Sequence, residues 1–259
     1  MMANSQIKKT LLGISFSFLS IQALAVPIQW TDWTTGETTA DGFVGMGVIT
    51  TDTATIDVTY MNPRGISFYQ PSGGVDFWTP RDPATSPYTS DVVDNIPTGT
   101  DIIALRFAGM QTLSFSETIA NPVFSYVSLN GNGYAFDQDF EILSFGHPSD
   151  GNACGFWGCG TSFKSVVDLG DGVFEYQLLG TGEPHGTIRF TGAFDTVSWR
   201  SLSNENWNGF TVGVEGTADE IFPDPDPEPD PTPVAEPGTL SVVALSLLAL
   251  AGFRRRVNR

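Results

Sequence analysis

Residues 53–60 read Thr-Ala-Thr-Ile-Asp-Val-Thr-Tyr, with apolar side chains at every even-numbered position and polar ones at every odd-numbered position. A period of two places the apolar side chains on one face of an extended strand, as in an antiparallel sheet with one buried face. Similar short runs, rich in β-branched and aromatic residues, recur between clusters of Gly, Pro, Asn and Asp. They predict further strands at residues 43–50, 65–69, 101–108, 112–119, 123–129, 134–145, 163–169, 173–179, 187–191, 196–202 and 209–214.

About a dozen strands without a convincing amphipathic helix predict an all-β fold: a single antiparallel β-sandwich or jelly-roll-like domain over residues 26–222. Asp171-Gly172 lies between two predicted strands and indicates a tight hairpin, because such dipeptides adopt the positive φ angles of a two-residue loop. Residues 70–99 contain five prolines and predict a long loop over one end of the sandwich.

The charge of the chain is unevenly distributed. The 259 residues include 12 Lys and Arg against 29 Asp and Glu, a net charge of −17. Half of the basic residues lie near the two ends: Lys8, Lys9, Arg254, Arg255, Arg256 and Arg259. The acidic region between them would repel a phosphate backbone, which excludes nucleic acid as a partner.

The first 25 residues have the organisation of a secretory signal peptide. Lys8 and Lys9 precede an apolar run at residues 11–21, and Ala23 and Ala25 form the small-residue pattern that signal peptidase recognises. The apolar run is well short of the roughly 20 residues that span a bilayer, which argues against a membrane anchor. We therefore expect export and cleavage after Ala25.

The C-terminal region combines a spacer with an apolar segment. Residues 223–233 alternate Pro with acidic or polar residues, a pattern that favours an extended polyproline II linker. Residues 239–253 carry no charge and are followed by Arg254, Arg255 and Arg256. This pattern predicts a transmembrane helix at about residues 238–253, with the basic tail 254–259 as a cytoplasmic stop.

The segment 234–259 resembles the PEP-CTERM sorting signal of Gram-negative bacteria. Val234, Glu236 and Pro237 match the short motif within residues 234–240, and the apolar helix and the Arg cluster follow in the expected order. Ala235 stands where the family usually has Pro. The resemblance implies recognition by exosortase, an inner-membrane-anchored precursor, and delivery to the cell surface or extracellular matrix. It also implies association with exopolysaccharide or biofilm.

Part of the central region resembles secreted β-sandwich domains that often carry such tails. The matching stretches are residues 121–126, 155–158, 183–190, 194–199 and 207–214. No catalytic activity follows from this second resemblance.

Cys154 and Cys159 are the only cysteines, and they enclose a glycine-rich loop. Because the chain is expected to enter an oxidising compartment, we predict that they form a disulfide. Free thiols and a metal-binding pair are the alternatives. A bridge over so short a loop would mainly shape the segment that presents Phe156 and Trp157.

Tryptophans provide candidate contacts for a sugar ring. Trp78 and Trp157 lie in predicted loops, so they are the candidate glycan contacts of a carbohydrate-binding module. Trp199 and Trp207 lie in or next to predicted strands and are expected in the core. His185 could act as a general base, but the sequence contains no G-x-S-x-G nucleophile motif. We therefore interpret it as a structural turn histidine.

Asp137, Asp139 and Glu141 are spaced by two, which would place three carboxylates on one face of a strand. Such a row is similar to the catalytic acids of laminarinase-like glycoside hydrolases, which need two carboxyls about 5 Å apart. The alternative is a solvated acidic face, and we predict no catalytic residues and no enzyme activity.

Two acidic segments raise the question of calcium. Residues 168–175 and 150–152 contain several Asp, Asn and Glu oxygens, the ligands that Ca²⁺ prefers. Their spacing is not that of an EF-hand loop, and turn formation explains Asp-Gly equally well. We predict no metal site or cofactor, with Ca²⁺ as the alternative.

Overall fold

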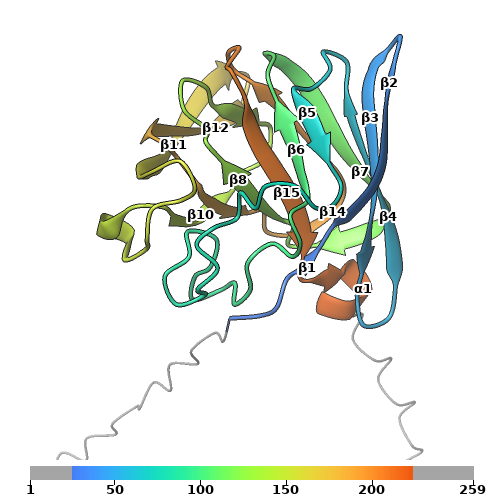
Figure 1. Cartoon of the computed structure of the whole chain (residues 1–259). Helices are drawn as coiled ribbons and strands as arrows, with labels where there is room; N and C mark the ends of the chain where they lie inside the picture. The colour runs from blue at the N-terminus through green and yellow to red at the C-terminus, as the bar shows by residue number, and fades with distance from the viewer. Residues whose placement is uncertain (1–24, 224–259) are drawn as a thin grey trace, which may run out of the picture. The chain divides into compact units, whose positions relative to one another are not determined.

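The structure is a computed structural model that describes residues 25–223. In this part of the chain, two sheets form a β-sandwich, and the predicted all-β class is confirmed (Figure 1). All pairings between its named strands are antiparallel. The whole sandwich belongs to one compact unit that ends at Phe222.

The seven-stranded sheet follows the order β10-β13-β8-β15-β6-β5, and β1 also pairs with β15. Its strands are β1 (Gln29–Trp30), β5 (Phe68–Gln70), β6 (Ile102–Leu105), β8 (Val123–Val127), β10 (Glu141–Phe145), β13 (Gly186–Arg189) and β15 (Asn208–Val214).

The nine-stranded sheet follows the order β11-β12-β9-β14-β7-β4-β3-β2, and β16 also pairs with β7. Its strands are β2 (Asp32–Thr39), β3 (Gly42–Thr50), β4 (Thr55–Asn62), β7 (Gly109–Ala120), β9 (Tyr134–Phe136), β11 (Gly160–Gly170), β12 (Val173–Gly182), β14 (Ala193–Ser201) and β16 (Gly216–Thr217).

The two helices found between residues 25 and 223 are short. A 3-10 turn spans Pro148–Asp150, and α1 spans Ala218–Ile221 with a capping box between Thr217 and Glu220. Neither is long and apolar enough to cross a membrane. The transmembrane helix predicted at about residues 238–253 lies outside the described residues.

The period-two pattern that predicted β4 is confirmed. Ile56, Val58 and Tyr60 are fully buried, whereas Thr55 and Asp57 are exposed. The predicted hairpin is also present, because Asp171-Gly172 joins β11 to β12 with φ angles of 53° and 78°. Two consecutive positive φ angles are those of the I′ turn, whose twist matches that of the flanking strands.

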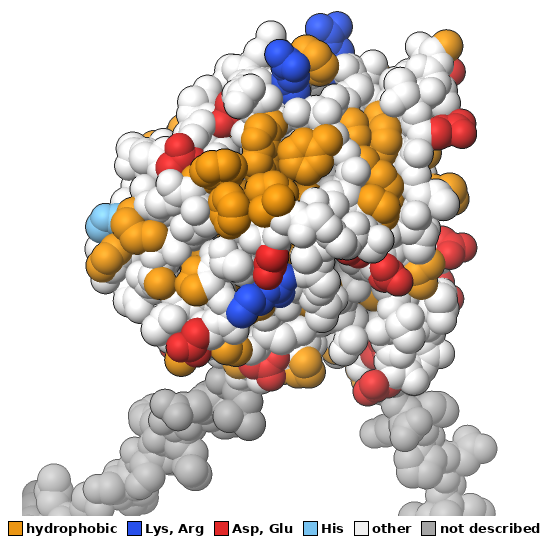
Figure 2. Space-filling view, viewed as in Figure 1, with side chains coloured by type: hydrophobic (Ala, Val, Ile, Leu, Met, Phe, Trp, Pro, Cys, Tyr) orange, Lys and Arg blue, Asp and Glu red, His pale blue; other side chains and the backbone are white. Residues whose placement is uncertain are grey.

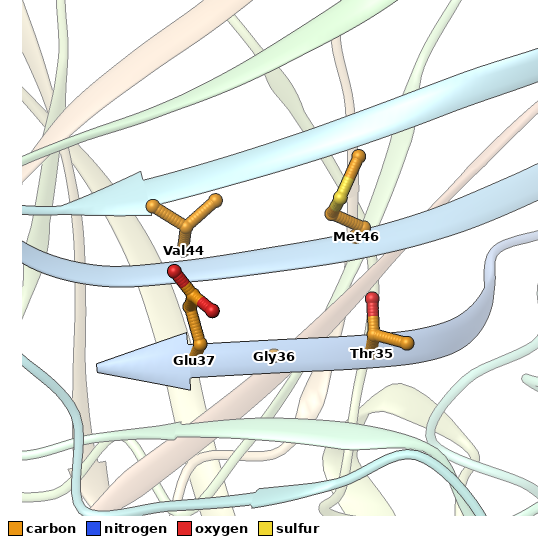
Figure 3. A pocket seen from close by; sticks show the side chains of 5 residues that line it. All are labelled: Thr35, Gly36, Glu37, Val44 and Met46. Atoms are coloured by element: carbon orange, nitrogen blue, oxygen red, sulfur yellow. The ribbon is translucent and has the colours of Figure 1, made fainter. Parts of the chain in front are cut away.

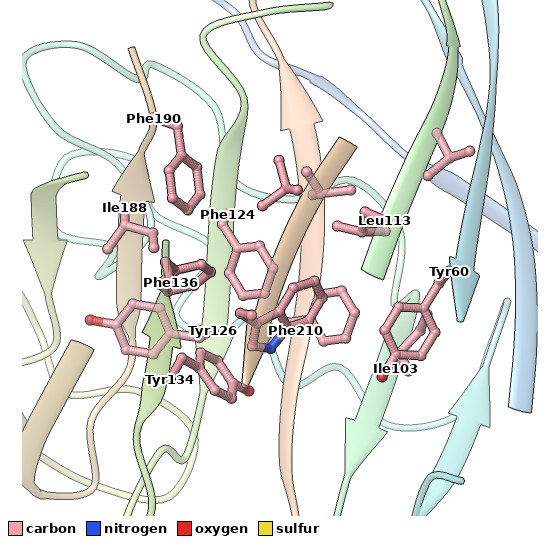
Figure 4. Close-up of a cluster of buried hydrophobic side chains, with 14 of the residues drawn as sticks. Tyr60, Ile103, Leu113, Phe124, Tyr126, Tyr134, Phe136, Ile188, Phe190 and Phe210 are labelled. Carbon is pink, nitrogen blue, oxygen red and sulfur yellow. The ribbon is translucent and has the colours of Figure 1, made fainter. Parts of the chain in front are cut away.

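Aromatic side chains from both sheets fill the core (Figure 4). The rings of Phe124 on β8 and Phe210 on β15 stack with centroids 4.8 Å apart. Trp199 on β14 of the other sheet meets these rings edge-on, at 5.2 Å and 5.1 Å. Such pairs contribute about 0.5–1.5 kcal/mol each beyond the burial of their area, so they hold the two sheets together.

The long loop at residues 71–101 covers the outer face of the seven-stranded sheet. On β8, Phe124 faces the sandwich core, whereas Val123 and Val127 belong to two separate buried clusters. These clusters contain Tyr88 and Val93 from the loop. The segment was therefore correctly predicted as a loop, but it covers a face of the sheet and not one end of the sandwich.

Two other predictions differ from the structure. The single strand expected at residues 134–145 is wrong: β9 and β10 belong to different sheets, and residues 137–140 connect them. β2 was not predicted, because its mainly Thr, Gly and Glu sequence resembles a polar loop. It is an edge strand, so most of its residues remain exposed and need no apolar pattern.

Candidate functional site

A group of five aromatic rings, two of them exposed, lies on one face of the sandwich. We call Phe68, Phe77, Phe156, Trp157 and Trp207 the aromatic patch. They come from β5, from the loop at 71–101, from the disulfide loop and from the residue before β15. Figure 2 shows hydrophobic side chains gathered on the face of the molecule that carries β5, β6 and β15 in Figure 1.

The rings of the aromatic patch support one another edge-on. Phe77 lies 5.1 Å from Phe156 and 5.0 Å from Trp207, and Phe156 lies 4.8 Å from Trp157, in each case between ring centroids. Phe77 is buried, whereas Trp157 is 52% exposed. The inner rings thus hold the outer ones at fixed angles, and Trp157 presents its indole to solvent.

A small cavity of about 230 Å³ adjoins the aromatic patch. The residues around it carry two indoles, two carboxyls, two amides and a hydroxyl: Ser128, Asn130, Trp157, Glu183, Glu205, Asn206 and Trp207. Trp157 and Trp207 lie with ring centroids 6.3 Å apart at an angle of 71°. The cavity therefore offers two aromatic rings beside several polar groups, which can contact the apolar and the polar parts of a ligand.

Hydrogen bonds fix the polar side of this cavity. Ser128 Oγ donates to Glu183 Oε2 at 2.7 Å, and Asn130 Nδ2 donates to Glu183 Oε1. Asn208 Nδ2 donates to Glu205 Oε2 at 2.8 Å. Burial raises the pKa of Glu205 to about 7, against the lowering effect of the hydrogen bond from Asn208, and the negative charge of Glu183 raises it further. Glu205 therefore changes between a hydrogen-bond donor and an acceptor near neutral pH.

The predicted disulfide between Cys154 and Cys159 is present and shapes the loop that carries Phe156 and Trp157. Its Cα atoms lie 4.4 Å apart, within the range of a native bridge. Gly155 rests directly against the imidazole of His185, so closely that a β-carbon at this position would collide with the ring. The bridge and this contact together fix the base of the loop.

His185 is buried and structural. Its Nδ1 lies 3.4 Å from both the hydroxyl of Tyr88 and the backbone nitrogen of Ser128, which donates to it. Burial lowers the pKa of His185 to about 4, so the ring is neutral at pH 7. It links the loop at 71–101 and the end of β8 to the disulfide loop, consistent with its interpretation as a structural histidine.

The prediction that Trp78 contacts a glycan is wrong. Its side chain is 0% exposed, packs edge-on against Tyr88 at 5.1 Å, and donates from Nε1 to the carbonyl of Asp101 at 3.1 Å. Trp157 is exposed as that prediction requires. Trp199 is buried in the core as expected, but Trp207 was also expected there and is instead a partly exposed member of the aromatic patch.

The predicted acidic row is also absent from the described structure. Asp137 and Asp139 lie in the connection between β9 and β10, and Glu141 begins β10 in the other sheet. Asp139 forms an ion pair with Lys164 at 2.7 Å, and Glu141 forms one with Arg189 at 2.9 Å. The three carboxylates therefore do not share one strand face, which removes the basis for a laminarinase-like site there.

The two segments considered for Ca²⁺ use their oxygens within turns. Asp168 Oδ1 accepts from the backbone of Gly170 at 2.8 Å, and Asp150 Oδ2 accepts from the amide of Asn152 at 2.8 Å. Glu175 pairs with Arg200 at 2.8 Å. Among residues 25–223, no three His, Cys, Asp or Glu side chains converge as a metal site would require.

A larger hollow of about 370 Å³ lies on β2 and β3, lined by Thr35, Gly36, Glu37, Val44 and Met46 (Figure 3). Figure 3 shows its side chains standing on two neighbouring strands, and Glu37 is its only ionisable group. It lacks both the aromatic rings and the converging polar groups of the smaller cavity. We therefore take the cavity beside Trp157 as the candidate site.

Several predicted functional residues lie outside the described part of the chain. These are Ala23 of the cleavage pattern, Val234, Glu236 and Pro237 of the sorting motif, and Arg254, Arg255 and Arg256 of the basic stop. Ala25 is the first described residue.

Comparisons with protein-family models, with curated proteins and with solved structures found no match to this chain. The site is therefore interpreted from its own geometry.

Proposed function

We propose that this chain is an exported, non-catalytic surface protein that binds extracellular polysaccharide at the cavity beside Trp157 and Trp207. The observation that carries the proposal is the exposure of Trp157, supported by fixed aromatic neighbours, directly beside hydrogen-bonded carboxylate and amide groups. An indole face packs against the C–H face of a sugar ring, and the polar groups bond its hydroxyls. The disulfide loop and the segment before β15 each supply one of the two indoles that line the cavity.

The sequence at both ends supports a surface location. In this proposal, signal peptidase removes residues 1–25, and the C-terminal segment holds the precursor in the inner membrane of a Gram-negative cell. Exosortase then processes the chain near residues 234–240 and releases it to the cell surface or extracellular matrix. Mass spectrometry of the surface form tests this route, because an intact Arg259 there would contradict processing.

Polysaccharide binding is tested by affinity electrophoresis of the purified protein through gels that contain different extracellular polysaccharides. We expect retardation by at least one polysaccharide and its loss in Trp157→Ala. Phe222→Ala is the control variant. Phe222 is also an exposed aromatic residue, at 48%, but it follows α1 and does not line the cavity. Equal retardation of the protein and of Trp157→Ala would refute this site.

A glycoside hydrolase is the second candidate, favoured by one observation. Glu183 and Glu205 line the same cavity, and burial raises the pKa of Glu205 to about 7, as a general acid requires. Against it, both oxygens of Glu183 already accept hydrogen bonds from Ser128 and Asn130. A hydrolase would release reducing ends from the bound polysaccharide and lose this activity in Glu205→Gln, whereas a binding protein releases none.

A further inference from the structure

The nine-stranded sheet ends in a long open edge at β11. Among the described residues, β11 forms a ladder only with β12, and Figure 1 shows it on the side of the fold away from β2, the other end of the same sheet. β11 has 11 residues, compared with three and five in β5 and β10, the end strands of the other sheet. At the start of β11, Gly160 N donates to Gly146 O at 3.1 Å. Beyond this bond, the outer edge of β11 leaves backbone donors and acceptors free to pair with another strand.

The β11 edge is also apolar. Phe163, Val166 and Leu169 are 47%, 52% and 61% exposed. On β12, Val173 and Phe174 are exposed as well, at 55% and 42%. β2 instead exposes Thr and Glu side chains at the opposite end of the sheet. β11 also carries one charge of each sign, Lys164 and Asp168. Exposed apolar side chains gathered at a long sheet edge are typical of a contact surface.

The sequence of β11 complements itself in an antiparallel arrangement. If two copies of the strand meet with Val166 on the two-fold axis, Lys164 of each copy lies opposite Asp168 of the other. Phe163 of each copy then lies near Leu169 of the other, at the irregularity that the β11–β12 ladder shows between Asp168 and Gly170. Oppositely charged and apolar cross-strand pairs both stabilise a sheet, and this register contains each of them twice.

We propose that two copies of this chain associate through β11, pairing antiparallel about Val166 so that the nine-stranded sheets become continuous. β11 carries one Lys and one Asp, so the contact itself has no net charge although the chain is strongly acidic. Lys164 Nζ pairs with an Asp139 side chain that is 62% exposed and also donates to the Phe140 carbonyl at 2.9 Å. An exposed ion pair of this kind is weak enough for Asp139 to be exchanged for a carboxylate across the axis.

The proposal is tested by sedimentation equilibrium of the purified protein over a wide concentration range. We expect a monomer–dimer equilibrium. Asp168→Lys places Lys opposite Lys on both sides of the axis and should raise the dimer dissociation constant about tenfold or more. The double variant K164E/D168K restores opposite charges in the reversed order and should restore the dimer.

Thr38→Lys, on the β2 edge, is the matched control and should leave the dissociation constant unchanged. Circular dichroism of every variant establishes that the sandwich is folded. A monomer at all concentrations would overturn the proposal. It would also be overturned by a dimer that Asp168→Lys leaves intact, which would show that another part of the chain mediates association.

Discussion

The burial of His185 makes the stability of the sandwich depend on pH in a way that one substitution can isolate. The ring is 0% exposed, its Nε2 has no hydrogen-bond partner among the described residues, and burial lowers its pKa to about 4. In the unfolded chain the pKa is about 6.5. Between these values the folded state binds fewer protons than the unfolded state, so this contribution to stability falls as the pH drops through 6.5 towards 4.

The linkage relation gives the size of the effect. With pKa values of about 4 folded and about 6.5 unfolded, His185 alone should remove about 2 kcal/mol of unfolding free energy between pH 7 and pH 5. Burial raises the pKa of Asp101 to about 6 and that of Glu205 to about 7, and both shifts act in the opposite direction. The pH dependence of the unsubstituted protein is therefore a sum in which the histidine effect is partly masked.

Comparing the unsubstituted protein with His185→Asn isolates the histidine effect, because both proteins contain Asp101 and Glu205 and their contributions cancel in the difference. Urea unfolding, followed by tryptophan fluorescence, gives the free energy of unfolding of both proteins at pH 7 and pH 5. We expect the variant to be less stable at pH 7, because the amide fills less of the buried site. The difference should shrink by about 2 kcal/mol at pH 5. A difference that is the same at both pH values would refute the buried, neutral state of His185.

Three further predictions concern the core, the disulfide and the cavity. Phe210→Ala should lower the free energy of unfolding by about 3–5 kcal/mol, whereas Met110→Ala, at a side chain that is 54% exposed, should change it by no more than about 0.5 kcal/mol in the same urea titration. Replacing Cys154 and Cys159 by Ser should cost at most about 2 kcal/mol, since the bridge closes a short loop, but should weaken polysaccharide retardation because Trp157 loses its support. Because the pKa of Glu205 is raised, the folded state binds more protons than the unfolded state between about pH 4.5 and pH 7, and Glu205 lowers the free energy of unfolding as the pH rises. Glu205→Gln should remove this contribution. An unchanged pH profile of the unfolding free energy would contradict the burial of this carboxyl.

The parts of the fold that were predictable from sequence are those in which local pattern and tertiary environment agree. β4 alternates because one face meets the core and the other meets solvent, and Asp171-Gly172 forms its turn from its own φ preferences. β2 gave no such signal, since an exposed edge strand needs no apolar face. The break at 137–140 was missed because alternation continues through it, although the chain changes sheets there.

The candidate site was only partly predictable, because it is assembled from segments distant in sequence. Trp157 was identified from its place in the disulfide loop. Trp78 lies in an equally loop-like segment, but that segment folds over the seven-stranded sheet and buries the indole. Glu183 follows β12, and Glu205 lies shortly before β15. The two residues line the same cavity only because of the strand order. Trp207 lies directly before a strand, and this position led to the expectation that it belongs to the core.

The affinity of the purified protein for the polysaccharide that retards it, measured by isothermal titration calorimetry, tests the proposed function most directly. We predict that Trp157→Ala weakens binding by at least about tenfold, the cost of losing one packed aromatic contact. Phe222→Ala should bind as the unsubstituted protein does. If Trp157→Ala binds with unchanged affinity, the cavity beside Trp157 and Trp207 is not the polysaccharide site.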